Sequence, residues 1–396
     1  MAKQTTSNSK THKSSSSSKA AKTTKGAAAA GALTPEPAQQ ASCAPLPEII
    51  HLGIDVHLRQ HVVCRKIDAA TVQPAQHMKP AELVAWVVKQ KSLARRVVCC
   101  YEAGPFGYTL QRQLAAQGIT CHVVRPQDWD RHGQRVKTDS RDARELAEAL
   151  ARYEAGNKHA LAIVRVPEVE QEQRRLITRQ REAFVREVRR LGAMGRSHGM
   201  TQGHEVNGRW WRKRAWSALI KGMPQHLRDL LESLAQVLLK LEELIAQRTA
   251  QIEAQATAAT ARPKGLGALT ECVIENEVHD WERFTNRRQV SSYTGLCPSE
   301  HSSGGSRRQG SINKHGNPRL RHPLVECVWR FIRMQPGWKR LLKVMGRLKG
   351  EDGRRPANKK KIAVTLAREL AVDLWRLKTG RTTLEALGLV PAQSAA

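Results

Sequence analysis

Hydrophobic residues follow two different patterns along this chain, and the change between them divides the protein. Between residues 49 and 153, short apolar runs alternate with segments in which apolar residues recur at helical spacing. The runs Ile49–Asp55 and His61–Ile67, separated by a short polar turn, predict two neighbouring strands. Because further strands and helices alternate beyond them, this region predicts an α/β domain with a central sheet.

Shorter patterns predict the other elements of this domain. Residues 80–91 and 106–116 have the apolar spacing of helices. Residues 97–101 and 119–124 are apolar runs of the length of buried strands. A last helix is predicted from about residue 138 to residue 153, before Gly156.

A long apolar repeat between residues 167 and 256 marks a second region. Its members follow an alternating four–three spacing and are Leu227, Leu231, Leu234, Leu238, Leu241, Ile245 and Ile252. This spacing predicts a coiled-coil seam, which can join two copies of the chain. The alternative is a helical hairpin within one chain. Its partner would be an earlier helix with Ile177, Phe184, Val188 and Leu191 on one side, before the glycine-containing stretch 192–208.

The C-terminal region is predicted to be helical around one glycine- and arginine-rich loop, residues 302–321. Its final helix ends at Gly380, a residue type typical of helix C-termini. The predicted fold class is therefore α/β plus α. The predicted divisions are a disordered basic tail 1–47, an α/β domain 48–157, a helical coiled-coil region 158–258, a mainly helical domain 259–384 and a flexible tail 385–396.

The charge of the chain indicates its kind of partner. Its 396 residues include 66 Lys and Arg against 36 Asp and Glu, a formal net charge of +30. The tail 1–47 contributes only +5, so most of the excess belongs to the folded domains. Such a surplus indicates a polyanionic partner, usually nucleic acid. A hydrophobic share of 40% excludes wholesale disorder, and the lack of a long apolar run argues against an integral membrane protein.

The cysteines and the N-terminal segment indicate a compartment. The eight cysteines are scattered, with no C-x-x-C pair of the zinc-site type and no disulfide-like framework. We interpret them as reduced intracellular thiols. The N-terminal segment has lysines but no apolar stretch of the signal-peptide kind. A cytoplasmic protein without membrane contact is therefore expected.

Four acids stand where a metal site is expected. Asp55 and Glu102 end predicted strands, and Asp139 and Asp142 begin a predicted helix, three residues apart on one face. Strand ends converge on one edge of a sheet, where such sites usually lie. Converging carboxylates need cations between them, and two Mg²⁺ ions would neutralise them and clamp a phosphodiester.

Each of these acids also has an ordinary structural explanation. Asp139 and Asp142 can cap the helix and favour its dipole, Asp55 can serve a turn, and Glu102 can pair with an arginine. The combination of all four favours the metal site. His57 and His61 are interpreted as surface or packing residues, because their spacing on a strand gives no shared site near the acids.

The segments GIDVH, YEAGPFGY and KTDSRDA resemble the acidic motifs of the DEDD insertion-sequence transposases, also called bridge-RNA-guided recombinases. The family order Asp, Glu, Asp, Asp matches Asp55, Glu102, Asp139 and Asp142 one for one. The resemblance implies a RuvC-like, RNase H-type fold for the first domain. AGPFGY departs from the AT-G-x-Y form of part of the family, so no role is assigned to Tyr108.

A second resemblance lies in residues 293–321, YTGLCPSEHSSGGSRRQGSINKHGNPRLR. The family has a similar loop in its second, serine-containing transposase domain, and its nucleophilic serine matches Ser303. Ser302, Ser306 and Ser311 are the competitors if this register is shifted. Basic residues around the serine can bind phosphate oxygens, namely Arg307, Arg308, Lys314, Arg319 and Arg321. The alternative is a phosphate-binding loop without chemistry.

Two other basic segments are candidate nucleic-acid contacts. In RWWRKRAW, residues 209–216, cations can bind phosphates while indoles stack on bases. Two adjacent tryptophans cannot both point inward on a helix, which favours nucleic-acid contact over a role in the core. The residues proposed here are Trp210, Trp211, Arg212, Lys213 and Arg214. The run Lys359, Lys360 and Lys361 precedes a helix and is expected to grip a backbone.

Together the two resemblances span about residues 50–380 and imply a site-specific DNA recombinase that moves its own insertion sequence. They imply an element-encoded guide RNA that pairs with target and donor double-stranded DNA. They also imply a homo-oligomer, a dimer or a tetramer in the synaptic complex, in which the acidic domain of one subunit meets the serine domain of another. The alternatives are a metal-dependent RuvC-like structure-specific endonuclease and a non-enzymatic RNA- or DNA-binding protein.

Overall fold

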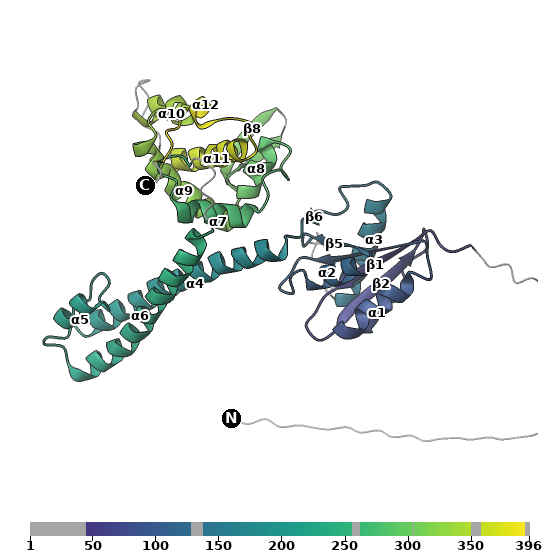
Figure 1. Ribbon diagram of the computed structural model, residues 1–396, viewed down its shortest axis with the longest axis horizontal. Coiled ribbons are helices and arrows are strands. Elements are labelled where there is room, and N and C mark those ends of the chain that lie inside the picture. Colours follow the sequence, from purple (N-terminus) through teal and green to yellow (C-terminus); the bar gives the residue numbers. More distant parts are fainter. Residues whose placement is uncertain (1–44, 128–137, 256–261, 304, 350–357, 393–396) are drawn as a thin grey trace, which may run out of the picture. The chain divides into compact units, whose positions relative to one another are not determined.

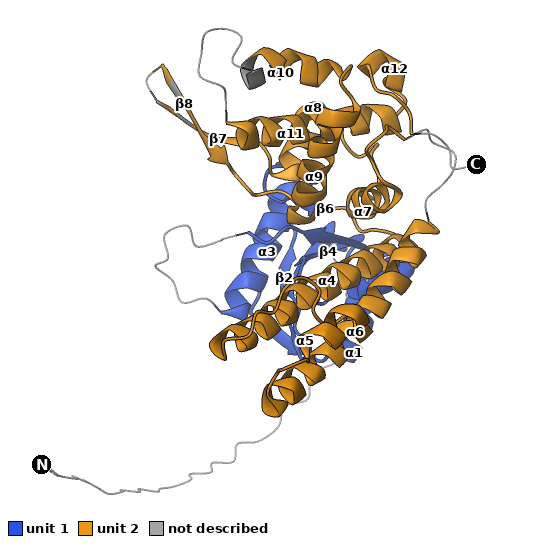
Figure 2. Cartoon of the chain, turned by 90° about the vertical axis from the view of Figure 1, so that its left-hand side faces the viewer, with its two compact units in different colours: residues 1–163 blue, residues 164–396 orange. Residues whose placement is uncertain are grey.

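The computed structural model describes residues 45–127, 138–255, 262–303, 305–349 and 358–392. For His301, Ser303, Arg307 and residues 347–349 it describes the backbone only. The chain divides into two compact units, residues 1–163 and 164–396 (Figure 2). The long helices after residue 164 therefore share a unit with the C-terminal helices. The predicted tail 1–47 lies outside the described residues, apart from residues 45–47.

The first unit contains a six-stranded mixed sheet with the order β3-β2-β1-β4-β5-β6. β1 pairs antiparallel with β2 and parallel with β4, which runs parallel to β5. The predicted strands are confirmed, whereas the short edge strands β3 and β6 have too few residues to show a period. This arrangement is compatible with a RuvC-like, RNase H-type domain. The strands are β1 (Ile49–Asp55), β2 (His61–Ile67), β3 (Gln76–Met78), β4 (Arg96–Glu102), β5 (Thr120–Val124) and β6 (Ile163–Val164).

Helices cover both faces of this sheet (Figure 1). α3 (Asp139–Glu154) packs across β1, β2 and β4, while α1 (Pro80–Gln90) and α2 (Thr109–Ala116) contact each other on the opposite side. Gly53 allows α3 to approach, because a Cβ at this position would collide with the backbone of Ala143 and Ala147. This close approach brings the N-terminal turn of α3 to the end of β1.

The second unit begins with two long antiparallel helices, α4 (Val169–Thr201) and α6 (Gln225–Glu253), which lie side by side with the short α5 (Lys213–Leu219) at their far end (Figure 1). Arg181 on α4 donates a hydrogen bond to Thr249 on α6, and Gln202 after α4 contacts His226. The earlier helix is therefore the antiparallel partner of the apolar seam, as the hairpin alternative expects. The predicted break at the glycines is wrong as far as Thr201.

The tryptophans of the RWWRKRAW segment are buried. Trp210 and Trp211 are 1% and 4% exposed and pack with residues of α6. They lie in the turn before α5 rather than on a helix, so the rule that only one of two neighbours can point inward does not apply. Both rings fit against glycines of α4, because a Cβ at Gly192 or Gly195 would collide with them. Base stacking by these two indoles, expected from the sequence, is not supported.

The remaining helices enclose one hydrophobic core. α9 and α11 pack against each other across its centre, and both are lined by buried leucines. α11 ends before Gly380, which has a positive φ of 67°, as predicted. The helices are α7 (Ala268–Val278), α8 (Arg287–Thr294), α9 (Pro318–Met334), α10 (Lys339–Lys349), α11 (Lys359–Lys378) and α12 (Leu384–Leu387).

Two predictions for this region are corrected. Residues 302–321 are not simply a loop, because β7 (Pro298–Ser303) and β8 (Ser306–Ile312) form an antiparallel hairpin. The flexible tail from residue 385 is wrong up to residue 392, since Leu387 and Leu389 are buried in the core. The two errors have different causes: the hairpin is ordered by pairing between two neighbouring polar strands, and the tail by burial of Leu387 and Leu389 against helices that are distant in sequence. Among the described residues, no helix combines the length and apolar character needed to cross a membrane.

Candidate functional site

Asp55 and Glu102 occupy matching positions on neighbouring strands. In the parallel pairing of β1 with β4, Ile54 lies beside Tyr101, so the next residues on the two strands are Asp55 and Glu102. Side chains alternate along a strand, so Asp55 shares the α3-facing side with Gly53. Cys100 of β4 donates to a carbonyl oxygen of α3, which places Glu102 on that side as well. The predicted convergence of these two acids is thus supported by the strand register.

The N-terminus of α3 supplies a third carboxylate to this edge. Asp139 is the first residue of α3, and its Oδ2 lies 3.4 Å from Nε2 of His57. The same His57 nitrogen lies 3.1 Å from Oδ2 of Asp55. Ligand atoms of these three residues all lie within 4.8 Å of one another. Asp55 and Asp139 are therefore brought together as predicted, with an imidazole between them.

The electrostatics of Asp55 reflect this crowding. Burial raises the pKa of the Asp55 carboxyl, His57 opposes the rise, and the negative charges of Asp139 and Asp142 add to it. Asp142 thus acts on Asp55 through space. Glu102 has a different environment, in which its Oε1 accepts a hydrogen bond from the backbone N–H of Gln127 at 3.2 Å.

The donor set at this edge suits a divalent cation. Asp55 and Asp139 offer carboxylate oxygens, the ligands preferred by Mg²⁺ and Mn²⁺, and His57 offers a nitrogen suited to softer divalent metals. A cation there would offset the burial and the mutual repulsion of the carboxylates, which together raise the pKa of Asp55. Transposases of the DEDD type usually use a divalent metal, and this group is compatible with one.

His57 is the residue that the sequence interpretation missed. The argument against it assumed a strand, but β1 ends at Asp55 and His57 lies in the following turn. There the chain reverses, and the backbone N–H of His57 donates to Nδ1 of His61 at 3.3 Å. His61 is buried, as its packing interpretation expects. The sequence feature that could have indicated its role is its position two residues after Asp55, the aspartate that ends the strand.

The serine segment lies at the tip of the β7–β8 hairpin. Ser303 ends β7 and pairs across the hairpin with Ser306, the first residue of β8. The structure describes only the backbone of Ser303, so its predicted role stays a prediction. Its neighbour Ser302 is exposed, and its hydroxyl donates to Oε1 of Glu300 at 2.9 Å.

Residues after the hairpin hold its base on the helical core. Asn317 donates from its side chain to the buried carboxylate of Glu277 at 2.8 Å. Arg321 donates to the backbone carbonyls of Thr294, Lys314 and Gly316. Asn317 and Arg321 are therefore structural anchors here.

Some of the other predicted phosphate ligands are held in ion pairs within the protein, and others are exposed to solvent. Arg319 is ion-paired with Glu182, and Arg212 with Glu242, in contacts within the unit. The side chain of Arg307 lies outside the described residues. Apart from Arg212, the exposed members of the set are Arg308, Lys314, Lys213, Arg214, Lys359, Lys360 and Lys361.

Comparison with known proteins covers both parts of the chain. Residues 52–198 match the DEDD transposase model of IS110 elements, and residues 261–343 match the model described as "Transposase IS116/IS110/IS902 family". "Putative transposase y4rJ" of Sinorhizobium fredii is 33% identical over 333 residues, which are 75% of this chain and 82% of that protein. The transposase for insertion sequence element IS1111A of Coxiella burnetii is 25% identical over 353 residues, covering 85% of this chain and 92% of its own.

These matches confirm the resemblance to the DEDD insertion-sequence transposases. The first matched region includes Asp55, Glu102, Asp139 and Asp142, and the second includes Ser303. The similarity to the Sinorhizobium protein extends over both regions at a level that establishes common descent. The chain therefore belongs to the IS116/IS110/IS902 family of transposases.

Proposed function

We propose that this transposase is an RNA-guided, site-specific recombinase that cleaves and rejoins DNA through a covalent link to Ser303. As a transposase, it is an enzyme that cuts and joins DNA. The proposal of a serine-linked recombinase rests on the presence of two features in the same chain. These are an acidic cluster at a sheet edge and a serine at the tip of a basic hairpin. Its proposed place of action is the bacterial nucleoid.

The proposed reaction exchanges one phosphodiester for another. Oγ of Ser303 attacks a DNA phosphorus, the bond from phosphorus to a deoxyribose oxygen breaks, and that oxygen leaves as a hydroxyl after taking a proton. A hydroxyl of a different strand end then attacks the phosphoserine, and the serine regains its proton. The number of phosphodiester bonds is unchanged over the two steps, so no ATP is required.

Acidic and basic side chains have separate proposed roles in this reaction. Asp55, Glu102, Asp139 and Asp142 would hold Mg²⁺, which when bound would neutralise charge on the phosphodiester. Exposed cations in and just after the hairpin, such as Arg308 and Lys314, would position the phosphate oxygens.

The proposed partners are the target and donor double-stranded DNA and a structured guide RNA encoded by the element. The protein is proposed to work as a dimer, and as a tetramer in the synaptic complex. The large positive charge supports polyanionic partners in general. The guide RNA itself rests on the resemblance of the acidic and serine motifs alone.

A metal-dependent endonuclease is the alternative function, since the acidic cluster by itself can serve hydrolysis. The two reactions differ in the fate of the phosphorus. Hydrolysis leaves it on DNA with a water oxygen, whereas recombination links it transiently to the protein.

The test traps the covalent intermediate. The full-length protein is incubated with plasmid DNA carrying the ends of its element, with and without the element's transcript, and the products are separated under denaturing conditions. We expect a protein–DNA adduct that maps to Ser303, requires the transcript, and is reduced at least about 100-fold in Ser303→Ala.

Ser302→Ala and Ser306→Ala are the matched controls, because both remove a neighbouring hydroxyl of the same hairpin. Adduct formation that persists in Ser303→Ala and maps to a neighbouring serine would show that the register is wrong. Cleavage that persists in Ser303→Ala with no adduct would establish the endonuclease instead. Cleavage that is the same without the transcript would exclude RNA guidance.

A further inference from the structure

A large open cavity of about 830 Å³ lies within the second unit, between α4, α7 and α9. Each helix presents one face to it, with lining residues three or four positions apart. On α4 these include Glu182, Arg186 and Arg189, and on α9 they include Arg330 and Arg333. We name this cavity the α4–α9 cleft. Its lining residues include neither the hairpin serine nor any residue of the acidic cluster.

Arginines line the cleft on two walls. Seven arginines line it against three glutamates. Arg186 and Arg189 of α4 and Arg333 of α9 are exposed, and within the described part of the chain no ion pair involves them. The lining therefore carries more positive than negative charge, which favours binding of an anion from outside.

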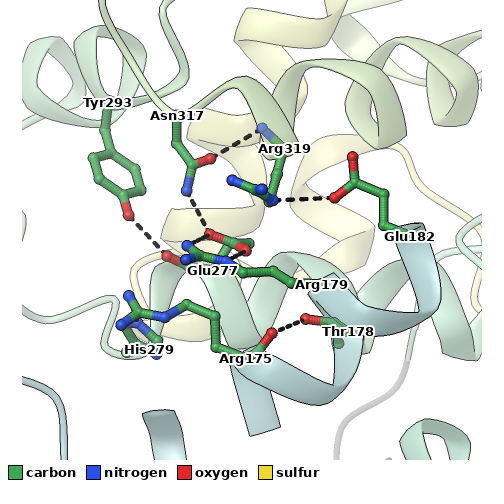
Figure 3. Close-up of polar contacts among 9 residues, drawn as sticks. All are labelled: Arg175, Thr178, Arg179, Glu182, Glu277, His279, Tyr293, Asn317 and Arg319. Atoms are coloured by element: carbon green, nitrogen blue, oxygen red, sulfur yellow. Dashed lines mark hydrogen bonds and ion pairs between the residues drawn. The ribbon is translucent and has the colours of Figure 1, made fainter. Parts of the chain in front are cut away.

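The floor of the cleft, in contrast, is neutral. Arg179 donates two hydrogen bonds of 2.9 Å to Glu277, whose side chain is 1% exposed, and Asn317 donates a third (Figure 3). Burial alone would raise the pKa of Glu277, but these donors hold it below its ordinary value. Arg319 pairs with Glu182 beside them (Figure 3). The floor arginines therefore hold the three helices together, while the free charge lies higher on the walls.

One aromatic side chain completes the lining. Trp329 of α9 lines the cleft and is 38% exposed, although most tryptophans of this unit are buried. An indole beside arginines is typical of surfaces on which unpaired bases stack while phosphates bind the cations. A duplex hides its base faces in the stack, so it would leave this indole unused.

We propose that the α4–α9 cleft binds a single-stranded segment of nucleic acid. Arg186, Arg189 and Arg333 contact its phosphates, and Trp329 stacks on one of its bases. The segment comes from unpaired RNA or from a DNA strand opened during the reaction, which share the same backbone charge and base faces. This site goes beyond the proposed function, and its test measures binding, so the outcome does not depend on Ser303.

The test removes two wall charges from α4. Full-length wild type and Arg186→Gln/Arg189→Gln are titrated with a labelled single-stranded DNA, with RNA of the same sequence, and with the duplex, over a series of salt concentrations. For single strands each lost phosphate contact lowers the slope of log affinity against log salt by about 0.7, so we expect a decrease of about 1.4. Both arginines are exposed, so the fold and its melting temperature should be retained.

The matched control is Arg174→Gln/Arg190→Gln, which removes the same charge from the same helix outside the cleft. It should leave the slope unchanged. Equal slopes in the wild type and in the cleft variant, or equal losses in the cleft variant and the control, would overturn the proposal. Tighter binding of the duplex than of either single strand would overturn it as well.

A second measurement locates the strand. Single strands that carry photoreactive 5-iodouracil are irradiated with the wild-type protein, and the crosslinked peptides are identified by mass spectrometry. Crosslinks at Trp329 are expected, and the arm that gives them, DNA or RNA, identifies the source. Crosslinks confined to other segments in both arms would overturn the proposal.

Discussion

Single side chains in the second unit show how a charge network fixes protonation states. Arg175 donates from Nη1 to Nε2 of His279 at 2.9 Å (Figure 3). An arginine has no acceptor, so His279 must be neutral at this nitrogen to accept the bond. Burial, Arg175 and Arg283 together lower the pKa of His279 to about 4. His279 follows the last residue of α7, with a φ of 65° and a ψ of −50°.

This pKa predicts a pH dependence of stability. Between its ordinary value of 6.5 and about 4, the unfolded chain binds a proton at His279 that the folded protein does not. Protonation therefore favours the unfolded state, and this contribution to stability is lost progressively as the pH falls from 6.5 towards 4. We expect His279→Asn to remove the contribution, so that the free energy of unfolding falls less steeply over this range.

Urea unfolding at several pH values between 4 and 7 measures this effect. The comparison is between variant and wild type, because His51 and His61 also have lowered pKa values and titrate in both proteins. Parallel pH profiles for the two proteins would mean that His279 is not held neutral in the folded state.

At the scale of elements, the α4–α6 hairpin depends on glycines at places where helices usually avoid them. Gly195 lies inside α4, yet a Cβ there would collide with the ring of Trp210. Trp210 cannot move aside easily, because it is 1% exposed and its Nε1 donates to the carbonyl of Gly192 at 3.1 Å. The glycines thus form the surface that receives the indoles.

This packing reverses the usual effect of a glycine-to-alanine change in a helix. Helix propensity alone would favour Gly195→Ala by about 1 kcal/mol. We expect the variant instead to be destabilised by up to about 2 kcal/mol, because overpacking a filled site costs about 1–3 kcal/mol and the propensity gain offsets only about 1 kcal/mol of it. Denaturant unfolding measures the difference.

Ala193→Gly is the control, since Ala193 is exposed on the same helix and lacks such a contact. It should cost about 1 kcal/mol through propensity alone. A gain in stability for Gly195→Ala would show that the tryptophan packing is looser than the structure indicates.

At the scale of the whole molecule, the acidic cluster and the serine hairpin belong to different compact units of the chain. In the proposed reaction, a complete centre needs both. The two can come from one protomer, or from two protomers of an oligomer, as the proposed function has it. Mixing two inactive variants distinguishes these cases.

We expect Asp55→Asn and Ser303→Ala each to lack strand exchange when tested alone. A mixture of the two variants should recover strand exchange. In a two-fold dimer with sites shared between subunits, a mixed dimer has one intact site, so equal mixing restores about a quarter of the sites. Recombination of an element-end plasmid measures the yield. A mixture as inactive as its components would show that each site is built within one protomer.

Much of the local structure was predictable from the sequence. Strands β1 and β2 and helix α3 were located within a residue or two, because a buried strand is a short apolar run and a helix with one buried face has a period of about 3.6. Asp55, Glu102 and Asp139 were located by the same means, since strand ends and helix starts can be read locally. Their combination pointed to the family that comparison then confirmed.

Other features depended on partners that are distant in sequence. From the sequence, His57 was interpreted as a surface or packing residue. In the structure, the turn after β1 places its ring beside Asp139, which is 82 positions away in the sequence. Trp210 looked like a contact for nucleic acid until the glycines of α4 gave it a place to be buried. The α4–α9 cleft could not be seen at all, because its walls come from helices separated by more than a hundred residues.

The sequence by itself determined most helices and strands, their order and the residues with reactive side chains, because each of these depends on residues close together in the chain. The tertiary structure decided which of those residues meet, which cations stay free and which aromatic rings remain exposed. The physical reason is that burial and electrostatic pairing are properties of the space around a side chain. That space is filled by segments whose identity a local pattern does not contain.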